Sequence, residues 1–296
     1  MSGNGLDGVI VVDKPTGCTS QQAVSRLKRA LGVKKAGHAG TLDPMATGVL
    51  VVGVGRATRL LGFIAGTNKA YHATIRLGQA TATDDAEGAP VGRRKDATGL
   101  DDATIMATIA GLTGDIQQTP SAVSAVKVAG RRAYAMVRAG EAPALPPRQV
   151  RVSRFEVLAR RDTEPYVDLD VAVECSTGTY IRALARDLGA SLDVGGHLTA
   201  LRRTQVGHFG LETAVGLDDV TRDDTLDISA VARLCFPALE LEDAGADDAA
   251  HGRPLAPVVP ADPTAVFARS GRFLALYRPA HTESVALAVF VDGVTS

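Results

Sequence analysis

The sequence predicts an α+β protein with a mixed, largely antiparallel sheet flanked by helices and a small β module at the C-terminus. Two observations support this fold class. Apolar or alternating segments of strand length recur along most of the chain, separated by only a few segments with helical spacing. After the proline-rich stretch 254–263, three short strand-like segments (265–269, 272–278 and 284–291) follow one another. We therefore expect two domains, 1–236 and 237–296.

The N-terminal elements are a strand and a capped helix. The β-branched run 9–12 ends in a turn at Pro15, which predicts a buried strand. Thr19 followed by Gln22 matches a capping box, an apolar stripe continues at helical spacing, and Gly32 supplies the stop.

Residues 37–50 read GHAGTLDPMATGVL, and we expect a loop there, because each glycine adds chain entropy that a helix or a strand must overcome. The loop runs into the apolar segment 49–54, which predicts a second buried strand. Pro44 fixes its own φ and favours an extended backbone at Asp43. The backbone conformation of the residue that carries this carboxylate is therefore restricted. An Asx turn, in which Asp43 only caps its own backbone, explains the same spacing equally well.

The middle of the chain alternates between strands and short helices. Segment 69–78 alternates with Tyr71 on the core side, where a tyrosine usually serves packing. Segments 150–158 and 166–174 are two further strands, and 101–111 is a short helix. Shorter predictions are a polar loop at 81–88, a strand at 124–128, a turn at Gly130, a helix at 131–139 and a helix at 228–234.

A helix is also predicted after Ser176-Thr177-Gly178, with Arg182 near its start and off its apolar stripe. The alternative for Arg182 is a surface ion pair with some carboxylate, which contributes little to stability. Segment 195–210 has too little periodicity for an assignment.

Composition excludes several classes of protein. The three cysteines and six histidines show no metal-ligand spacing, so we expect no metal and no disulfide framework. Residues 53–58 imitate a dinucleotide fingerprint, but Thr58 replaces the third glycine and no acid follows at the ribose position, so we expect no nucleotide cofactor. No apolar run is long enough for a membrane helix, and we expect a cytoplasmic protein.

The net charge of −1 gives no global sign of nucleic-acid binding. Basic residues nevertheless gather before the Asp43 loop (26–35) and in the middle of the chain (131–161). They could form a phosphate footprint, or simply a solvated surface.

Several stretches together resemble the TruB family of tRNA pseudouridine synthases, which isomerise a uridine in the tRNA T-loop. They are Asp13-Lys14-Pro15 with Thr19-Ser20, GHAGTLDPMATGVL, Tyr71 followed by LGQATATDDAEG, PSAVSAVKVAGRRAY, and STGTYIRALARDLG followed by HLTALRR. The resemblance covers most of residues 8–210. It implies the pseudouridine synthase fold, no cofactor, and action at position 55 of tRNA by base flipping.

The resemblance also implies roles for individual residues. Asp43 is the expected catalytic aspartate and Arg182 its ion-pair partner, while His38 contacts the flipped nucleotide and Tyr71 stacks on the target base. A neighbouring guanidinium favours an ionised carboxylate, which suits this chemistry. Attack of Asp43 on the sugar C1′, attack on the base and removal of a sugar proton all remain open.

By the same resemblance Tyr180 and Leu201 line the uridine pocket. Lys14 belongs to a Lys-Pro motif, where a structural role is as well founded as contact with substrate. Val123 stands where the family often has an aromatic residue, which concerns packing. The C-terminal strands resemble a reduced PUA domain, an RNA-binding module.

Two other functions fit the sequence. One is an RNA-binding or RNA-folding protein in which catalysis is secondary, and the two roles can coexist. The other is a guide-RNA-dependent or ribosomal pseudouridine synthase. The compact C-terminal module disfavours the guide-dependent enzyme, and the amino-acid sequence of the Asp43 loop disfavours the ribosomal one. For the tRNA enzyme we expect the T-arm as partner, no protein partner, and a monomer.

Overall fold

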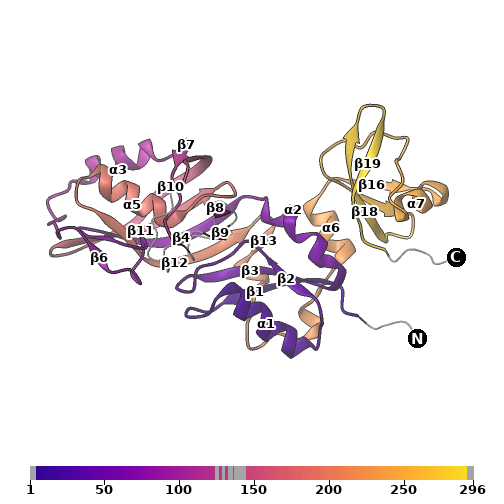
Figure 1. The fold of residues 1–296 in the computed structure, drawn as a ribbon, viewed down its shortest axis with the longest axis horizontal. Coiled ribbons are helices and arrows are strands. Elements are labelled where there is room, and N and C mark those ends of the chain that lie inside the picture. The colour runs from indigo at the N-terminus through magenta and orange to yellow at the C-terminus, as the bar shows by residue number, and fades with distance from the viewer. Residues whose placement is uncertain (1–4, 124–126, 129–130, 133–135, 137–144, 292–296) are drawn as a thin grey trace. The chain divides into compact units, whose positions relative to one another are not determined.

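The computed structural model describes residues 5–123, 127–128, 131–132, 136 and 145–291 (Figure 1). Its contacts divide the chain into two compact units. The first comprises Met1–Asp43, Val49–Ala65 and Gly207–Ser296, and the second comprises Pro44–Gly48 and Gly66–Val206. Strands predominate over helices in both units, which confirms the α+β class. Among the described residues, no helix has the length and apolar character needed to cross a membrane.

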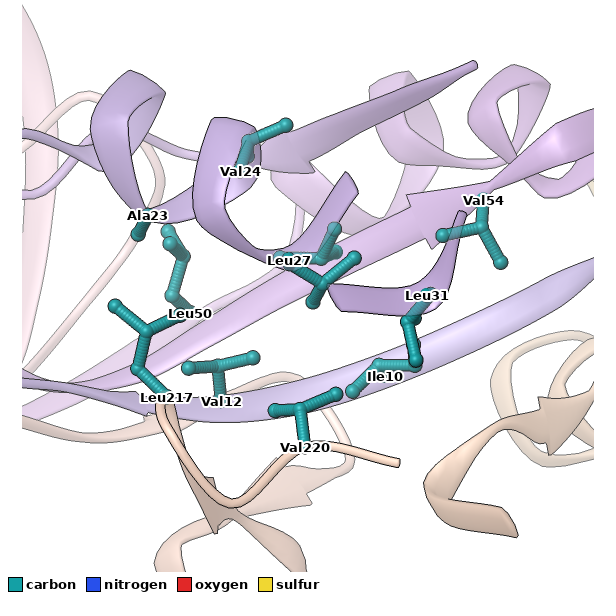
Figure 2. Packing of buried hydrophobic residues seen from close by; sticks show 11 residues of the cluster. Ile10, Val12, Ala23, Val24, Leu27, Leu31, Leu50, Val54, Leu217 and Val220 are labelled. Atoms are coloured by element: carbon teal, nitrogen blue, oxygen red, sulfur yellow. The ribbon is translucent and has the colours of Figure 1, made fainter. Parts of the chain in front are cut away.

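In the first unit, helix α1 (Ser20–Leu31) packs on strands β1 (Gly8–Lys14) and β3 (Thr47–Val54). Figure 2 shows Val24, Leu27 and Leu31 of the helix in one cluster with Ile10 and Val54 of the strands. Two short strands, β14 (Val215–Gly216) and β15 (Leu226–Asp227), pair with β1, in parallel and antiparallel orientation respectively.

The predicted ends of α1 are confirmed. The Thr19 hydroxyl accepts from the Gln22 backbone N–H at 3.1 Å, and the Thr19 N–H donates to Gln22 Oε1 at 2.8 Å. Gly32 ends the helix in the left-handed conformation, with φ 65°, which glycine adopts without strain.

The strand predicted at 49–54 is confirmed within β3, which begins two residues earlier, whereas the loop predicted from Gly37 is wrong at its start. Strand β2 (Ala36–Ala39) pairs antiparallel with β3, so the loop proper is 40–46. Gly37 lies opposite Gly53, and a Cβ on either would come within 3.1 Å of the Leu61 side chain. The glycines therefore belong to the strands because they make room for Leu61, which outweighs their entropic cost.

The remainder of this unit includes the C-terminal module. Its four-stranded sheet has the order β16-β17-β18-β19, and helix α7 packs against it. The three predicted strands are confirmed, whereas β16 and α7 were not predicted. The bounds are η1 Gly55–Arg59, α2 Leu61–Ala65, β13 Phe209–Gly210, η2 Leu211–Thr213, η3 Arg222–Asp224, α6 Ile228–Cys235, β16 Ala238–Leu241, α7 Asp243–Ala250, β17 Thr264–Ala268, β18 Phe273–Ala280 and β19 Glu283–Val289.

The second unit is built on an antiparallel sheet with the order β12-β4-β11-β10-β7. Residues of β4 alternate between buried and partly exposed, as predicted. The bounds are β4 Lys69–Leu77, β5 Ala80–Thr81, β6 Pro90–Val91, α3 Asp102–Gly111, β7 Gly114–Gln118, β8 Lys127–Val128, β9 Arg131–Arg132, β10 Arg148–Thr163, β11 Tyr166–Cys175, α5 Ile181–Ser191 and β12 Gly196–Val206.

Two segments of this unit differ from the prediction. Segment 195–210, left unassigned, contains the long strand β12, whose register shifts at 198/200 and 203/205 interrupt the expected alternation. The helix expected from Arg131 is wrong at its start, because β9 pairs there with β8. Met136 is helical. Most of the rest of 131–139, the turn at Gly130 and residues 124–126 of the predicted strand lie outside the described residues. The domain boundary at 236/237 stays a prediction.

Candidate active site

Asp43 is half-buried and lies in the loop between β2 and β3. The start of α1 fixes this loop: the Ser20 hydroxyl donates to the Leu42 carbonyl at 3.0 Å and accepts from the Leu42 N–H at 2.8 Å. Ser20 and Leu42 are both buried. Leu42, the residue before Asp43, is thus anchored through both of its backbone polar groups.

His38 is half-buried on β2, where it pairs with Val52 of β3, so regular strand structure sets its backbone. Lys14 is completely buried at the end of β1. Its Nζ donates to the carbonyls of Pro15 at 2.9 Å and Cys18 at 2.8 Å. These two bonds hold the turn that leads into α1 and support the structural role for Lys14.

In the second unit, Tyr71 and Leu201 come from neighbouring strands. Leu201 pairs with Ala73, two residues beyond Tyr71 on the same face of β4, so Tyr71 and Leu201 are diagonal neighbours. Both side chains are 7% exposed. The structure therefore brings these two predicted site residues together.

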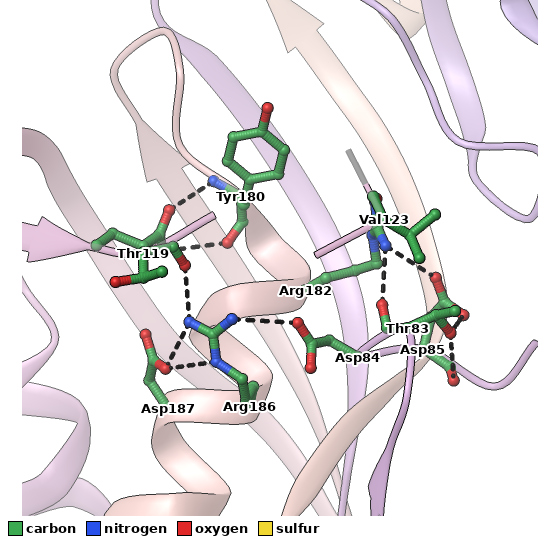
Figure 3. A network of polar contacts seen from close by, with 10 residues as sticks. Thr83, Asp84, Asp85, Thr119, Val123, Tyr180, Arg182, Arg186 and Asp187 are labelled. Atoms are coloured by element: carbon green, nitrogen blue, oxygen red, sulfur yellow. Dashed lines mark hydrogen bonds and ion pairs between the residues drawn. The ribbon is translucent and has the colours of Figure 1, made fainter. Parts of the chain in front are cut away.

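Tyr180 is the half-buried residue before α5. The buried side chain of Gln118 fixes its backbone: Gln118 Oε1 accepts from the Tyr180 N–H at 2.8 Å, and Gln118 Nε2 donates to the Tyr180 carbonyl at 3.1 Å. Figure 3 shows the Tyr180 ring pointing away from the arginine side chains of α5. Gln118 had not been predicted, because an amide at a strand end looks like ordinary surface.

Arg182 is buried, with 4% exposure, and its guanidinium contacts Thr83, Val123 and Asp85 (Figure 3). Its guanidinium donates to the carbonyls of Thr83 and Val123, each at 2.8 Å, and lies 3.4 Å from Asp85 Oδ2. Asp85 in turn accepts from the Thr83 hydroxyl and, at 3.1 Å, from the Glu87 N–H. The surface alternative for Arg182 is wrong, and its pairing with Asp43 stays a prediction.

A second arginine of α5 extends this network. Arg186 donates to the Thr119 carbonyl at 2.8 Å and forms ion pairs with Asp84 at 3.2 Å and Asp187 at 2.8 Å. Burial raises the pKa of Asp187, and the charge of Arg186 opposes that rise. The predicted polar loop 81–88 thus supplies two buried carboxylates, Asp84 and Asp85, which contact the arginines of helix α5.

Asp84 and Asp85 were not predicted as site residues, although the motif TATDDAEG contains them. Two adjacent acids in a loop usually face solvent. The signal that could have identified them is Arg182 itself, because a guanidinium on a largely apolar helix needs a carboxylate when it is buried. Among the described residues, no group of three or more His, Cys, Asp or Glu side chains could hold a metal ion.

Comparison with known proteins identifies the family. Residues 28–181 match the TruB family pseudouridylate synthase (N terminal domain), residues 182–237 the tRNA pseudouridylate synthase B C-terminal domain, and residues 236–291 tRNA pseudouridine synthase II, C terminal. The tRNA pseudouridine synthase B of Mycobacterium sp. (strain KMS) is 52% identical over 97% of this chain and 98% of its own. The protein of that name from Rhodococcus jostii (strain RHA1) is 58% identical over 85% and 83%.

Solved structures agree with this assignment. A chain of a Cbf5-Nop10-Gar1 complex superposes with a TM-score of 0.73 and 26% identity, covering 97% of this chain and 85% of its own. A chain of an H/ACA RNP bound to a substrate RNA containing 2′-deoxyuridine gives a TM-score of 0.70 and 25% identity over 97% and 86%. The matched domains, the relatives and the fold agree: this chain belongs to the TruB family of pseudouridylate synthases.

Proposed function

We propose that this protein converts the uridine at position 55, in the T-loop of tRNA, to pseudouridine, with Asp43 as the essential carboxylate. Family membership supports the isomerase chemistry. Relatives at 52–58% identity that carry the name tRNA pseudouridine synthase B support tRNA as the substrate. The C-terminal module, which the TruB C-terminal family also matches, is the proposed additional RNA contact.

The reaction breaks the bond between uracil N1 and the sugar C1′, and forms one between C5 and C1′. The base loses the proton on C5 and gains one on N1, so the reaction is redox-neutral. An ionised carboxylate can act as the nucleophile or the base in such a rearrangement. Asp43 is proposed for this role and Arg182 as the guanidinium that favours its charged form.

The target base must leave the stacked loop before it can react, at a cost of a few kcal/mol. An aromatic ring that stacks on the base returns about 1–3 kcal/mol, and this is the role proposed for Tyr71. Leu201 and Tyr180 are the proposed walls of the uridine pocket, and His38 contacts the flipped nucleotide. The diagonal placement of Leu201 beside Tyr71 supports a common pocket for these two residues.

The observation that carries the proposal is the loop of Asp43, anchored at Leu42 by Ser20 and continued by Pro44 in a chain of this family. A catalytic carboxylate needs a fixed backbone, whereas a turn aspartate on an exposed loop does not. The test is tritium release from a T-arm stem-loop that carries C5-tritiated uridine. Wild type should release tritium, and Asp43→Asn should bind the stem-loop without releasing it.

The same substitution, tested in cells, separates catalysis from RNA binding. If tRNA maturation in cells is restored fully by Asp43→Asn, an RNA-folding role is the main one. We further propose that the protein acts in the cytoplasm as a monomer, on the T-arm alone, with no guide RNA and no protein partner. Modification of an isolated T-arm by the purified protein, and its mass in solution, test these points.

A further inference from the structure

Arg203 on strand β12 is the largest fully buried side chain among the described residues, with 1% exposure. Placing a charged guanidinium in the interior is costly unless its donors are satisfied. Such a residue is a candidate for a function that an apolar side chain of the same size could not perform.

Tyr71 is one partner of Arg203. The two residues pair directly across β12 and β4, so their side chains lie on the same face of the sheet. A hydrogen bond joins the two side chains. A guanidinium has only donors, so the Tyr71 hydroxyl oxygen is the acceptor. Burial lowers the pKa of Arg203, and the interaction with Tyr71 opposes that change.

The backbone of Arg203 is fixed from its other side as well. Arg203 pairs with Gly48 of β3, within the stretch Pro44–Gly48 that directly follows Asp43 in the chain. Gly48 has φ +100°, and a Cβ there would lie 2.1 Å from the Arg203 carbonyl oxygen. Arg203 is therefore held between the strand of Tyr71 and the end of the Asp43 loop, with little freedom to move.

We propose that Arg203 is the positioning residue of Tyr71. Its planar guanidinium holds the phenol oxygen from a fixed direction, which sets the tilt of the ring and turns the hydroxyl hydrogen away from Arg203. The inference rests on the proposed function, in which the Tyr71 ring stacks on the target base. It adds that the tyrosine requires a buried arginine behind it to present that ring in one orientation.

The contact can be measured in the free protein. Tyrosine labelled with ¹³C at Cζ reports the hydrogen bond at its oxygen, and the chain has five tyrosines, so Tyr71→Phe identifies the resonance. Arg203→Lys should shift the Tyr71 resonance because the planar donor is lost. Arg76→Gln, on the same strand β4, removes an ion pair with Asp168 instead and should leave the resonance in place. An unchanged resonance in Arg203→Lys contradicts the proposal.

A double-mutant cycle on single-turnover tritium release tests the functional consequence. Arg203→Met, which keeps the buried volume, should slow isomerisation about 10- to 100-fold, the loss typical of a hydrogen bond from a charged donor. Because Arg203 acts through the hydroxyl, adding Arg203→Met to Tyr71→Phe should cause no further slowing. Arg76→Gln is the control. Any slowing of tritium release that it causes should be independent of Tyr71→Phe, so the slowing in the double variant should equal the product of the two single effects.

Arg203→Lys keeps a buried cation and a donor. If Arg203→Met does not fold, Arg203→Lys replaces it in the double-mutant cycle with Tyr71→Phe. Arg203→Lys alone should slow isomerisation less than Arg203→Met, and adding it to Tyr71→Phe should again cause no further slowing. Effects of Arg203 and Tyr71 that multiply would overturn the positioning role while leaving the proposed function intact. No release by wild type would overturn the proposed function, and this inference with it.

Discussion

Replacing Asp85 by Asn tests whether its ion pair with Arg182 fixes the start of helix α5. The two side chains are each 5% exposed and lie 3.4 Å apart. Asn keeps the size of the side chain but removes the charge of Asp85, which lies beside the buried guanidinium. Breaking such a pair costs about 3–5 kcal/mol. Because the carbonyls of Thr83 and Val123 still accept from Arg182, we expect the lower end, about 3 kcal/mol.

Urea unfolding followed by circular dichroism measures this loss, with an unchanged m-value as the sign that two-state behaviour persists. Asp168→Asn is the matched control. Asp168 pairs with Arg76 at 2.7 Å, but Arg76 is 34% exposed, so solvent screens the pair and about 1 kcal/mol is expected. A loss for Asp85→Asn no larger than that of Asp168→Asn would refute the idea that this buried pair fixes Arg182.

Three further predictions concern the loop and the sheet. Ser20→Ala removes both hydrogen bonds that anchor the Asp43 loop, so tritium release should slow, while the free energy of unfolding falls by about 1–3 kcal/mol. Gly48→Ala forces a Cβ against the Arg203 carbonyl and should lower the melting temperature sharply, whereas Gly99→Ala, with open space at its Cβ, should not. Burial and the charge of Arg203 lower the pKa of Lys69 from 10.5 to about 8. Between these values the unfolded chain binds more protons, so stability should rise with pH, and Lys69→Met should abolish that rise in urea unfolding.

Local signals in the sequence predicted those elements whose ends are set by their own residues. The cap of α1 by Thr19 and Gln22, and its stop at Gly32, need no tertiary context. Strand β4 alternates because one of its faces is buried. The resemblance to the family also selected Tyr71 and Leu201, which the sheet places as diagonal neighbours.

Long-range contacts determine the features that were missed. Gly37 belongs to a strand because of space that Leu61 needs, and β12 contains register shifts that only pairing with β4 reveals. In the sequence Asp85 resembles an ordinary loop carboxylate, and only the tertiary structure shows that it pairs with Arg182. Arg203 likewise reads as surface charge in the run LRR, because only the cross-strand register identifies Tyr71 as its partner.

The most direct test of the account is the effect of Asp43→Asn on C5-tritiated uridine in a T-arm stem-loop. The substitution keeps the size of the side chain and removes the ionisable oxygen, so the fold and the affinity for the stem-loop should stay close to wild type. The account predicts that tritium release stops, even in single-turnover experiments with excess protein. Release at the wild-type rate would contradict the assignment of Asp43 as the essential carboxylate.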